Sequence, residues 1–403
     1  MWRLSAALVP HTSSSLTFFL LNPIPREESM VTTYTTVEQL TSVVRLCRLV
    51  SQSAAPFSST FANYMLFSPP HVVALSHSCT LILNCPWHTP SFSMPIAQAD
   101  SLLSLFPPQE KVIITTDKEG ERVVLSIRDS KSVFNVPPPH QFPEPEIPVA
   151  SQEVKVDASR LSDAMTRCIH GAKGAARHAE AIHMYYRDQN IVCLGTDLYK
   201  AVIDAVPVTA SCDLNATIPL SHIPLIAGFC KLHDSVYIKV VRDGRSLMFV
   251  NPHGVVITQL LSLSLLESLK KIAEKVIEAT NSNYYTEYTL HSNFRSACNV
   301  VYSIAQRDKG MARFLCAQDY IAISAQTAEN SINVRVSAKC SSFHEDTSGL
   351  LQLPLLNDVL PVLPPVVRMF APPPQEKRSI WVFAPADQQF PVCAVSPIAE
   401  KDE

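Results

Sequence analysis

Basic side chains recur along three stretches of this 403-residue chain in which apolar residues repeat with the spacing of an α-helix. The stretches are VEQLTSVVRLCRLVSQ, SRLSDAMTRCIHGAKGAARH and HSNFRSACNVVYSIAQRDKG, which begin at residues 37, 159 and 291. Their basic residues are Arg45, Arg48, Arg160, Arg167, Lys173, Arg177, Arg295, Arg307 and Lys309. Because guanidinium and ammonium groups hold phosphate oxygens, the chemistry that these residues predict is the binding of a polyanion.

The charge of the chain is unevenly distributed. There are 33 basic and 36 acidic residues, and the formal net charge is −3. The three stretches contain nine of the basic residues and three of the acidic ones, which leaves 24 basic and 33 acidic residues elsewhere. An acidic body with basic helices can present one positive surface to a polyanion and repel it elsewhere. The net charge therefore does not exclude a nucleic-acid partner.

The sequence shows no pattern typical of an active site, a metal site or a cofactor site. GAKGAA at 171–176 lacks the Gly-Lys-Ser/Thr ending of a phosphate-binding loop. His178 and His183 do not match a zinc-ligand spacing. Asp197 follows the apolar run IVCLGT, where a turn residue that accepts hydrogen bonds from its own backbone is expected more often than a catalytic acid. We expect a protein that is not an enzyme and that has no catalytic residue, metal or cofactor.

Eleven scattered cysteines without a CxxC pair indicate reduced thiols and a cytosol-like compartment. Cys47, Cys168 and Cys298 fall among apolar neighbours on the three helical stretches, so we expect buried side chains and not nucleophiles. No stretch approaches the roughly 18 uninterrupted apolar residues of a membrane span.

Residues 1–29 form a Ser-rich leader whose first acidic residue is Glu27. Organellar targeting segments are basic and poor in acids, and the leader has only two basic residues. We favour the alternative, in which the leader is disordered and Met30 is the real or ancestral start.

The three helical stretches begin 122 and 132 residues apart, which is the size of a domain and too long for a solenoid repeat. Each stretch leads into strands, a short apolar helix and further strands. We therefore expect an α+β fold of three tandem domains, each a duplicated helix-plus-strands unit, with helices inside and sheets outside. The expected segments are a leader at 1–29, a first domain at 30–137, a Pro-rich linker at 138–153, a second domain at 154–265, a helical linker at 266–284 and a third domain at 285–400.

Several segments resemble one family. AIHMYYRDQNIVCLGTDLYKAVIDAVPV and ATIPLSHIPLIAGFCKLHDSVYIKVVRDGRSLMFVNPHGVVITQLL are similar to the middle domain of the bacterial DNA polymerase III beta subunit, the sliding clamp. There, Gly195–Ala201 and Ile218–Ser221 match the family's Ala-Thr-Asp-Gly-His-Arg-Leu and Ile-Pro-Arg-Lys motifs. FNVPPPHQFPEPEIP resembles the Phe-Pro-Glu linker, and CAVSPIAE resembles the Val-Met-Pro-Met terminus. The resemblance covers residues 30–400 in the family's order.

The resemblance implies three clamp-type (DNA clamp) domains and a head-to-tail homodimeric ring, with helices lining the hole and sheets outside. Such a ring encircles double-stranded DNA without reading its sequence and serves DNA replication as a processivity factor for the polymerase. The nine basic residues would line the channel, and Lys173 and Arg177 match the loop where the family touches DNA. The implied location is the cytoplasm of a bacterial or phage-infected cell, or an organelle if residues 1–29 are a transit peptide.

The family's polymerases and clamp loader insert a short peptide into a pocket between the second and third domains. The residues that match its walls are Thr196, Leu198, Tyr199, Lys200 and Ala201 on one side and Val395, Ser396, Pro397 and Ile398 on the other. The family's Phe-Pro-Asp-Tyr segment is missing, and LLESLKKIAEKVIEA stands in its place and predicts a short charged helix. We expect a pocket with an altered peptide preference; the alternative is that these residues only pack between domains.

Two other functions stay open. A clamp-like regulatory or decoy protein would bind replication partners without encircling DNA, and it would be a monomer or would not form a closed hole. A hydrolase on the same α+β repeats would need a clustered nucleophile and base, which the sequence does not show.

Overall fold

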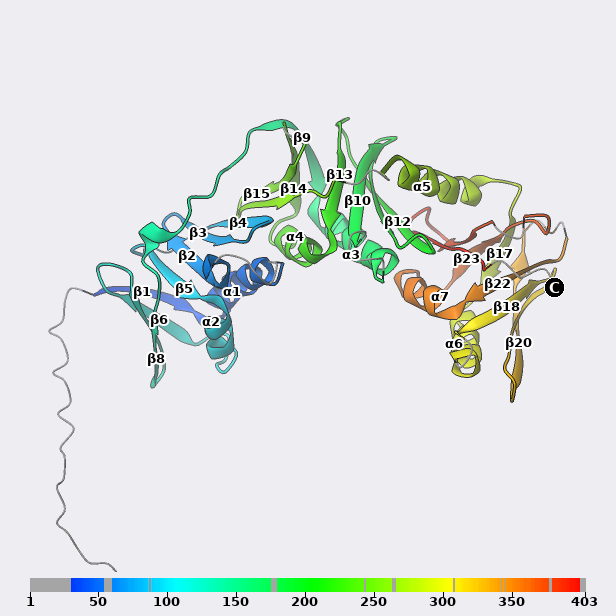
Figure 1. The fold of residues 1–403 in the computed structure, drawn as a ribbon, viewed down its shortest axis with the longest axis horizontal. Coiled ribbons are helices and arrows are strands. Elements are labelled where there is room, and N and C mark those ends of the chain that lie inside the picture. Colours follow the sequence, from blue (N-terminus) through cyan, green and yellow to red (C-terminus); the bar gives the residue numbers. More distant parts are fainter. Residues whose placement is uncertain are drawn as a thin grey trace, which may run out of the picture.

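The computed structural model describes residues 30–53, 60–85, 87, 89–174, 180–242, 244–262, 266–306, 309–341, 343, 345–376 and 379–398. They form an arch with sheets on its convex side and six helices, α1–α4, α6 and α7, on its concave side (Figure 1). One further helix, α5, lies on the convex side. Within the described residues, no helix is long and apolar enough to cross a membrane.

The first third of the arch is an α+β unit with two concave helices. Its elements are β1 (Val31–Thr36), α1 (Val37–Gln52), β2 (Tyr64–Ser68), β3 (His71–Leu75), β4 (Cys79–Asn84), β5 (Phe92–Pro95), α2 (Ile96–Leu103), β6 (Lys111–Thr116), β7 (Arg122–Ile127) and β8 (Ser130–Asn135).

The middle third repeats this order. Its elements are β9 (Ala150–Asp157), α3 (Ala158–Ala172), β10 (Ala181–Arg187), β11 (Asn190–Thr196), β12 (Lys200–Pro207), β13 (Asn215–Pro219), α4 (Ile223–Cys230), β14 (Ser235–Val241), β15 (Ser246–Asn251) and β16 (Gly254–Gln259).

The last third follows the convex helix. Its elements are α5 (Leu266–Asn281), β17 (Thr286–Leu290), α6 (Asn293–Ala305), β18 (Met311–Cys316), β19 (Tyr320–Gln326), β20 (Ser331–Ser337), β21 (Lys339–Cys340), β22 (Thr347–Gln352), α7 (Leu353–Val359), β23 (Val367–Ala371), β24 (Trp381–Pro385) and β25 (Val392–Val395).

One unit is repeated six times along the chain. Each concave helix is followed by three strands that pair antiparallel in chain order, and a fourth strand pairs with the first of the three. The third strands are β4, β8, β12, β16, β20 and β25. Two antiparallel pairs of third strands, β4 with β16 and β12 with β25, join neighbouring units into sheets of eight and nine strands. The α+β fold of duplicated units with helices inside is confirmed.

The inner helices begin close to the predicted positions. Asp157 caps α3, since its carboxylate accepts the Arg160 N–H at 2.8 Å. The prediction that this helix runs to His178 is wrong within the described part of the chain, because α3 ends at Ala172. Lys173 is extended and Gly174 has a φ of +94°, and neither conformation continues a helix. Residues 175–179 lie outside the described residues.

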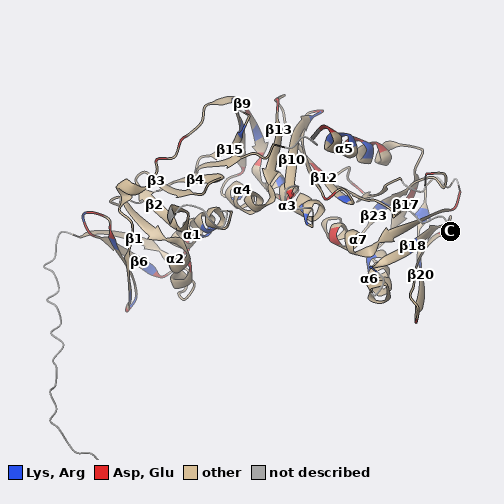
Figure 2. Ribbon diagram, in the orientation of Figure 1, with Lys and Arg blue, Asp and Glu red and all other residues tan. Residues whose placement is uncertain are grey.

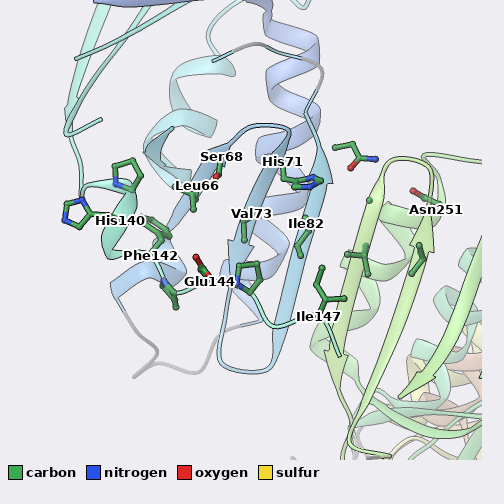
Figure 3. A pocket seen from close by; sticks show the side chains of 17 residues that line it. Leu66, Ser68, His71, Val73, Ile82, His140, Phe142, Glu144, Ile147 and Asn251 are labelled. Carbon is green, nitrogen blue, oxygen red and sulfur yellow. The ribbon is translucent and has the colours of Figure 1, made fainter. Parts of the chain in front are cut away.

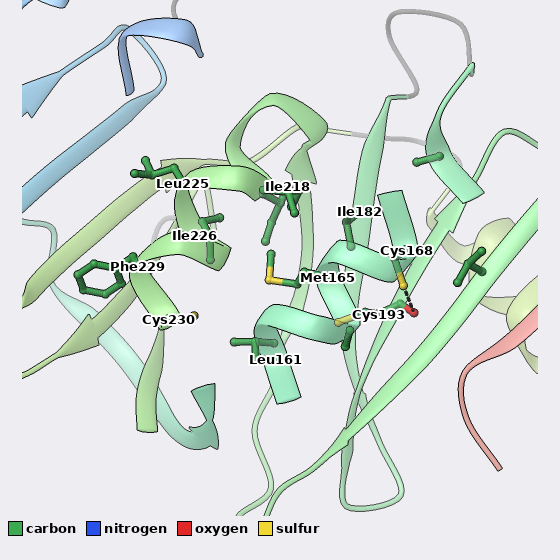
Figure 4. Close-up of a cluster of buried hydrophobic side chains, with 14 of the residues drawn as sticks. Leu161, Met165, Cys168, Ile182, Cys193, Ile218, Leu225, Ile226, Phe229 and Cys230 are labelled. Atoms are coloured by element: carbon green, nitrogen blue, oxygen red, sulfur yellow. Dashed lines mark hydrogen bonds between the residues drawn. The ribbon is translucent and has the colours of Figure 1, made fainter. Parts of the chain in front are cut away.

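The middle third shows how the two layers are held together (Figure 4). Leu161 and Met165 of α3 and Phe229 of α4 are fully buried between the helices and the sheet. Removing such a side chain from water stabilises the fold by roughly 1.5–3 kcal/mol.

The predicted burial of Cys47, Cys168 and Cys298 is confirmed. Burial raises the pKa of Cys47 and Cys298 to about 12, which favours the protonated thiol at neutral pH.

Candidate DNA-lining surface and peptide site

The concave surface is a continuous row of helices. Contacts join them in the spatial order α2, α1, α4, α3, α7 and α6, so the row crosses both junctions between domains. Figure 2 shows Lys and Arg on the concave helices α1, α3 and α6, and residues of both signs on the convex helix α5. The inner helices therefore lie side by side along one surface of the arch.

Five of the nine predicted basic residues are exposed, namely Arg45, Arg48, Arg160, Lys173 and Lys309. Arg48 forms an ion pair with Asp100 of α2, yet half of its side chain remains exposed. Arg177 and Arg307 lie outside the described residues. The exposed residues come from all three domains.

Arg167 and Arg295 are held by the protein itself. Arg167 Nη1 donates to the Asp204 carboxylate at 2.7 Å, and burial raises the pKa of that carboxyl although Arg167 opposes the shift. Arg295 Nη2 donates to the carbonyls of Leu360 at 2.6 Å and Pro364 at 3.0 Å, and also to Leu363. Arg295 thus satisfies the carbonyls that follow α7. Neither contact was predictable from sequence, and we leave both residues out of the channel surface proposed below.

The two predicted walls of the peptide site lie side by side. β12 pairs with β25 so that Lys200 is opposite Val395. The Ser396 N–H donates to the Tyr199 carbonyl at 2.7 Å, and the Ile398 N–H donates to Leu350 at 2.9 Å. We call residues 196–201 the client loop and residues 395–398 the C-terminal wall. Segments almost 200 residues apart in sequence are therefore joined by the sheet at the second junction.

The client loop is a tight, internally bonded turn. Asp197 accepts the backbone N–H groups of Tyr199 at 2.9 Å and Lys200 at 2.8 Å, which confirms the prediction of a turn residue. Leu198 has a φ of +77°, an uncommon conformation for a residue with a Cβ. This turn leaves Leu198 60% and Tyr199 67% exposed. Large apolar side chains held out in water are suited to contact with a partner.

The nine predicted peptide-site residues differ in exposure. Leu198 and Tyr199 are exposed, and Ser396, Pro397 and Ile398 are half-buried, so these five can touch a ligand. The other four are buried beneath them: Thr196, Lys200, Ala201 and Val395. Thr196 Oγ1 donates to the Lys200 carbonyl at 2.8 Å and accepts the Leu198 N–H at 3.0 Å. Its role is to shape the loop.

The helix predicted in place of the Phe-Pro-Asp-Tyr segment is α5. Leu269, Ala273, Val276 and Ala279 are buried against the convex face of the second junction, where Leu194 and Val382 belong to the same apolar cluster. The helix thus closes the outer face of the sheet beside the peptide site.

The first junction carries a groove that the sequence did not reveal (Figure 3). Its volume is about 710 Å³, and its wall is the Pro-rich linker, including Phe142, Glu144 and Ile147. Its floor includes Val73 of β3 and Ile82 of β4. An extended linker covers less of the sheet than a helix does, which explains why a groove remains here.

Among the described residues, no three His, Cys, Asp or Glu side chains could share a metal ion.

Comparison with protein-family models and with curated protein sequences gives no match. Comparison with solved structures gives likeness over the whole arch. The DNA polymerase III beta subunit of Thermotoga maritima superposes with a TM-score of 0.76 at 14% identity, over 92% of this chain and 100% of that one. The beta subunit of Pseudomonas aeruginosa gives 0.74 at 12% identity, over 92% and 100%. That of Streptococcus pyogenes gives 0.74 at 11%, over 92% and 100%.

The chain has the fold of the bacterial sliding clamps. At these identities the likeness establishes the fold and not the partners. The clamp fold agrees with the α+β architecture predicted from the sequence pattern and with the clamp-type domains that the resemblance implies, and the low identity agrees with a divergent sequence.

Proposed function

We propose that this protein is a DNA sliding clamp, a homodimeric ring that encircles duplex DNA and tethers a replicative polymerase as a processivity factor. The observation that supports the proposal most directly is that two of the six third strands each have one edge without a strand partner among the described residues. Four of the six third strands pair within the chain, and the remaining two, β8 and β20, lie at the two ends of the arch (Figure 1).

The two junctions within the chain follow one rule. The third strand of a domain's first half pairs antiparallel with the third strand of the next domain's second half, as β4 does with β16 and β12 with β25. By this rule β20, the third strand of the last domain's first half, would pair with the third strand of a further domain's second half. In a second copy of the chain, β8 is such a strand. Two copies joined head to tail then satisfy all four ends and close a ring.

The free edges have side chains suited to this pairing. On β8, Val133 is 46% exposed, and on β20, Ile332 and Val334 are half-buried. An unpaired edge of this length is a template for another strand, and proteins normally cover or interrupt it. Pairing with a second copy removes both edges and extends each four-stranded end sheet to eight strands.

The concave helices would then surround the DNA. Arg45, Arg48, Arg160, Lys173 and Lys309 are exposed, and such groups neutralise phosphates without reading bases. Acidic residues on the convex side would repel DNA from the outer surface. Contacts of this kind are weak individually, so the ring can slide while its closure prevents release.

The client loop and the C-terminal wall would receive a short peptide from the polymerase or from a clamp loader. Exposed Leu198 and Tyr199 beside half-buried Ile398 offer apolar contact to such a peptide. With α5 in place of the family's Phe-Pro-Asp-Tyr segment, the peptide preference would differ from that of other clamps.

A clamp-like regulator that does not encircle DNA is the second candidate. It is favoured by one observation: Arg167 and Arg295 are held by carboxylate and carbonyl groups, which reduces the positive charge available on the concave surface.

The two candidates differ in topology. The full chain, diluted until it dissociates, is mixed with nicked circular DNA, concentrated and passed over a gel-filtration column in high salt. A ring should stay with the circle and be released when the DNA is linearised. Binding that high salt removes equally from circular and linear DNA, together with a monomeric mass in light scattering, would contradict the ring and support the regulator.

A further inference from the structure

The buried side chain of Lys200 runs from the client loop toward the concave side of the arch. Its side chain is 2% exposed. Its ammonium group contacts the Asp358 carboxylate of α7 and lies 3.7 Å from the Asp197 carboxylate. A buried ammonium is strongly destabilising unless it is paired, so this geometry is held firmly. The family has arginine at this place in the motif, and the contact with Asp358 is a feature of this chain's own residues.

Asp358 joins the client loop to two inner helices. It lies in the last turn of α7, and its backbone carbonyl accepts Nδ1–H of His170 on α3 at 3.0 Å. Nδ1 is the donor because a carbonyl can only accept. Lys200, Asp358 and His170 therefore connect a surface loop to neighbouring helices of the concave row.

The same carboxylate is exposed to whatever fills the concave side. The Asp358 side chain is 46% exposed, in contrast to the buried Lys200. Phosphates brought near α7 would repel the Asp358 carboxylate and displace it. Because this carboxylate is paired with Lys200, its displacement would also move the Lys200 side chain. Lys200 in turn is bonded through its backbone to Asp197, which shapes the turn that carries Leu198 and Tyr199.

We propose that Lys200 is a positioning residue that couples the client loop to the DNA-lining helix α7 through Asp358. DNA in the hole then changes the conformation of the client loop, and a bound client changes the affinity for DNA by the same factor. This inference rests on the proposed function, since it assumes that DNA occupies the concave side.

The test uses the full chain with Tyr199→Trp and 5-fluorotryptophan labelling. The parent chain has three tryptophans, so the additional fluorine resonance reports on the client loop. Binding of a fluorescein-labelled random-sequence duplex is measured by anisotropy, and the fluorine spectrum is recorded with saturating unlabelled duplex. We expect the resonance of residue 199 to shift when DNA binds.

Lys200→Met removes the charge and keeps the length of the side chain, and it should abolish the shift. Lys200→Arg retains a cation and should preserve it. Asp358→Asn, at a half-exposed position, is the second variant if Lys200→Met does not fold. The matched control is Lys239→Met, because Lys239 also lies on a strand and pairs with a carboxylate, that of Glu153 at 3.0 Å. It should leave the shift unchanged.

Two failures are distinguishable. A chain that binds DNA while the resonance of residue 199 does not move, or moves equally in Lys200→Met or Asp358→Asn, overturns the coupling and leaves the clamp function standing. A chain that binds no duplex contradicts the clamp function and the coupling together.

Discussion

Gly171 of α3 and Gly195 of β11 face each other so closely that neither position has room for a side chain. A Cβ at Gly195 would lie 1.8 Å from the Cys168 carbonyl oxygen, and a Cβ at Gly171 would lie 2.1 Å from the Gly195 oxygen. The pair lets α3 sit directly on the strand that leads into the client loop.

Gly195→Ala is therefore expected to destabilise the fold by about 3 kcal/mol, because backbone atoms must separate to accept the methyl group. Gly228→Ala on α4 is the control, since its Cβ would meet only flexible side chains, those of Leu46 at 3.1 Å and Leu49 at 3.8 Å. Alanine also favours a helix by about 1 kcal/mol over glycine. Urea unfolding should give a large loss for the first variant and little change for the second; equal losses would contradict the close approach.

Sequence patterns predict the concave helices well because α1, α3 and α6 have apolar stripes of helical period. They do not predict β1, β9 and β17, the strands before those helices. β1, for example, reads VTTYTT, which has no apolar alternation, and its two buried residues are Thr33 and Thr35. A strand of this kind is fixed by its neighbours, as β1 is by β6.

The candidate site is predictable in its backbone and not in its charged contacts. The motif around Asp197 indicates a turn because the aspartate can bond its own backbone. Nothing local indicates that Lys200 pairs with Asp358, a residue 158 positions away, or that Arg295 binds carbonyls after α7. These partners meet only once the domains have packed, so a helix face alone overstates how many basic residues are free.

Ring closure can be tested on the two edges of one sheet. β8 and β1 are the outer strands of the first four-stranded sheet, and Val133 and Val31 are 46% and 44% exposed. Val133→Glu should prevent dimerisation, because it places a charge in the proposed β8–β20 joint. Val31→Glu on the opposite edge should leave the dimer intact. Light scattering over a dilution series measures both, and a dimeric Val133→Glu chain would count against the proposed joint.

DNA binding should depend on the concave surface and not on the convex one. Lys173→Glu, at the end of α3, should weaken duplex binding several-fold and lower the slope of log Kd against log salt by about 1 for each lost phosphate contact. Lys271→Glu on the convex helix α5 is the matched charge reversal and should leave both quantities unchanged. Anisotropy titrations at several salt concentrations would show this, and equal effects would argue against a DNA-lining concave side.

Acid should destabilise the fold through two buried histidines. Burial lowers the pKa of His183 and of His222 from 6.5 to about 4. The unfolded chain therefore binds more protons than the folded chain as the pH falls below 6.5, and the stability present above that pH is lost. Each histidine removes about 1.4 kcal/mol per pH unit until its folded pKa is reached.

His222 also links two domains, since Ser78 lies 2.9 Å from Nε2 and Thr258 lies 2.6 Å from Nδ1. His222→Gln should flatten the dependence of stability on pH between 6.5 and 4, whereas His140→Gln at an exposed position should not. Chemical unfolding at a series of pH values makes the comparison. A pH profile that His222→Gln leaves unchanged would rule out this histidine as the source.

Peptide binding should require the C-terminal wall. Short random peptides selected on the wild-type chain should bind it and lose binding to Ile398→Asp, because a charge there disrupts apolar contact. Ile147→Asp, in the linker and 63% exposed in the parent, is the control and should retain binding. Peptides that bind Ile398→Asp as well as wild type would move the site elsewhere.

The connections between domains give the outer surface of the proposed ring a lower rotational symmetry than its inner surface. Its inner layer would repeat one helix unit twelve times, so a duplex passing through would meet nearly the same surface at every rotation. The outer perimeter has three kinds of joint: one under a proline-rich strap, one under α5, and one with no connecting chain. A protein bound to the outer surface would therefore have only two equivalent binding sites on the ring. The joint without a connecting chain, which would occur twice in a ring of two copies, would be where the ring can open with no linker holding the two domains together.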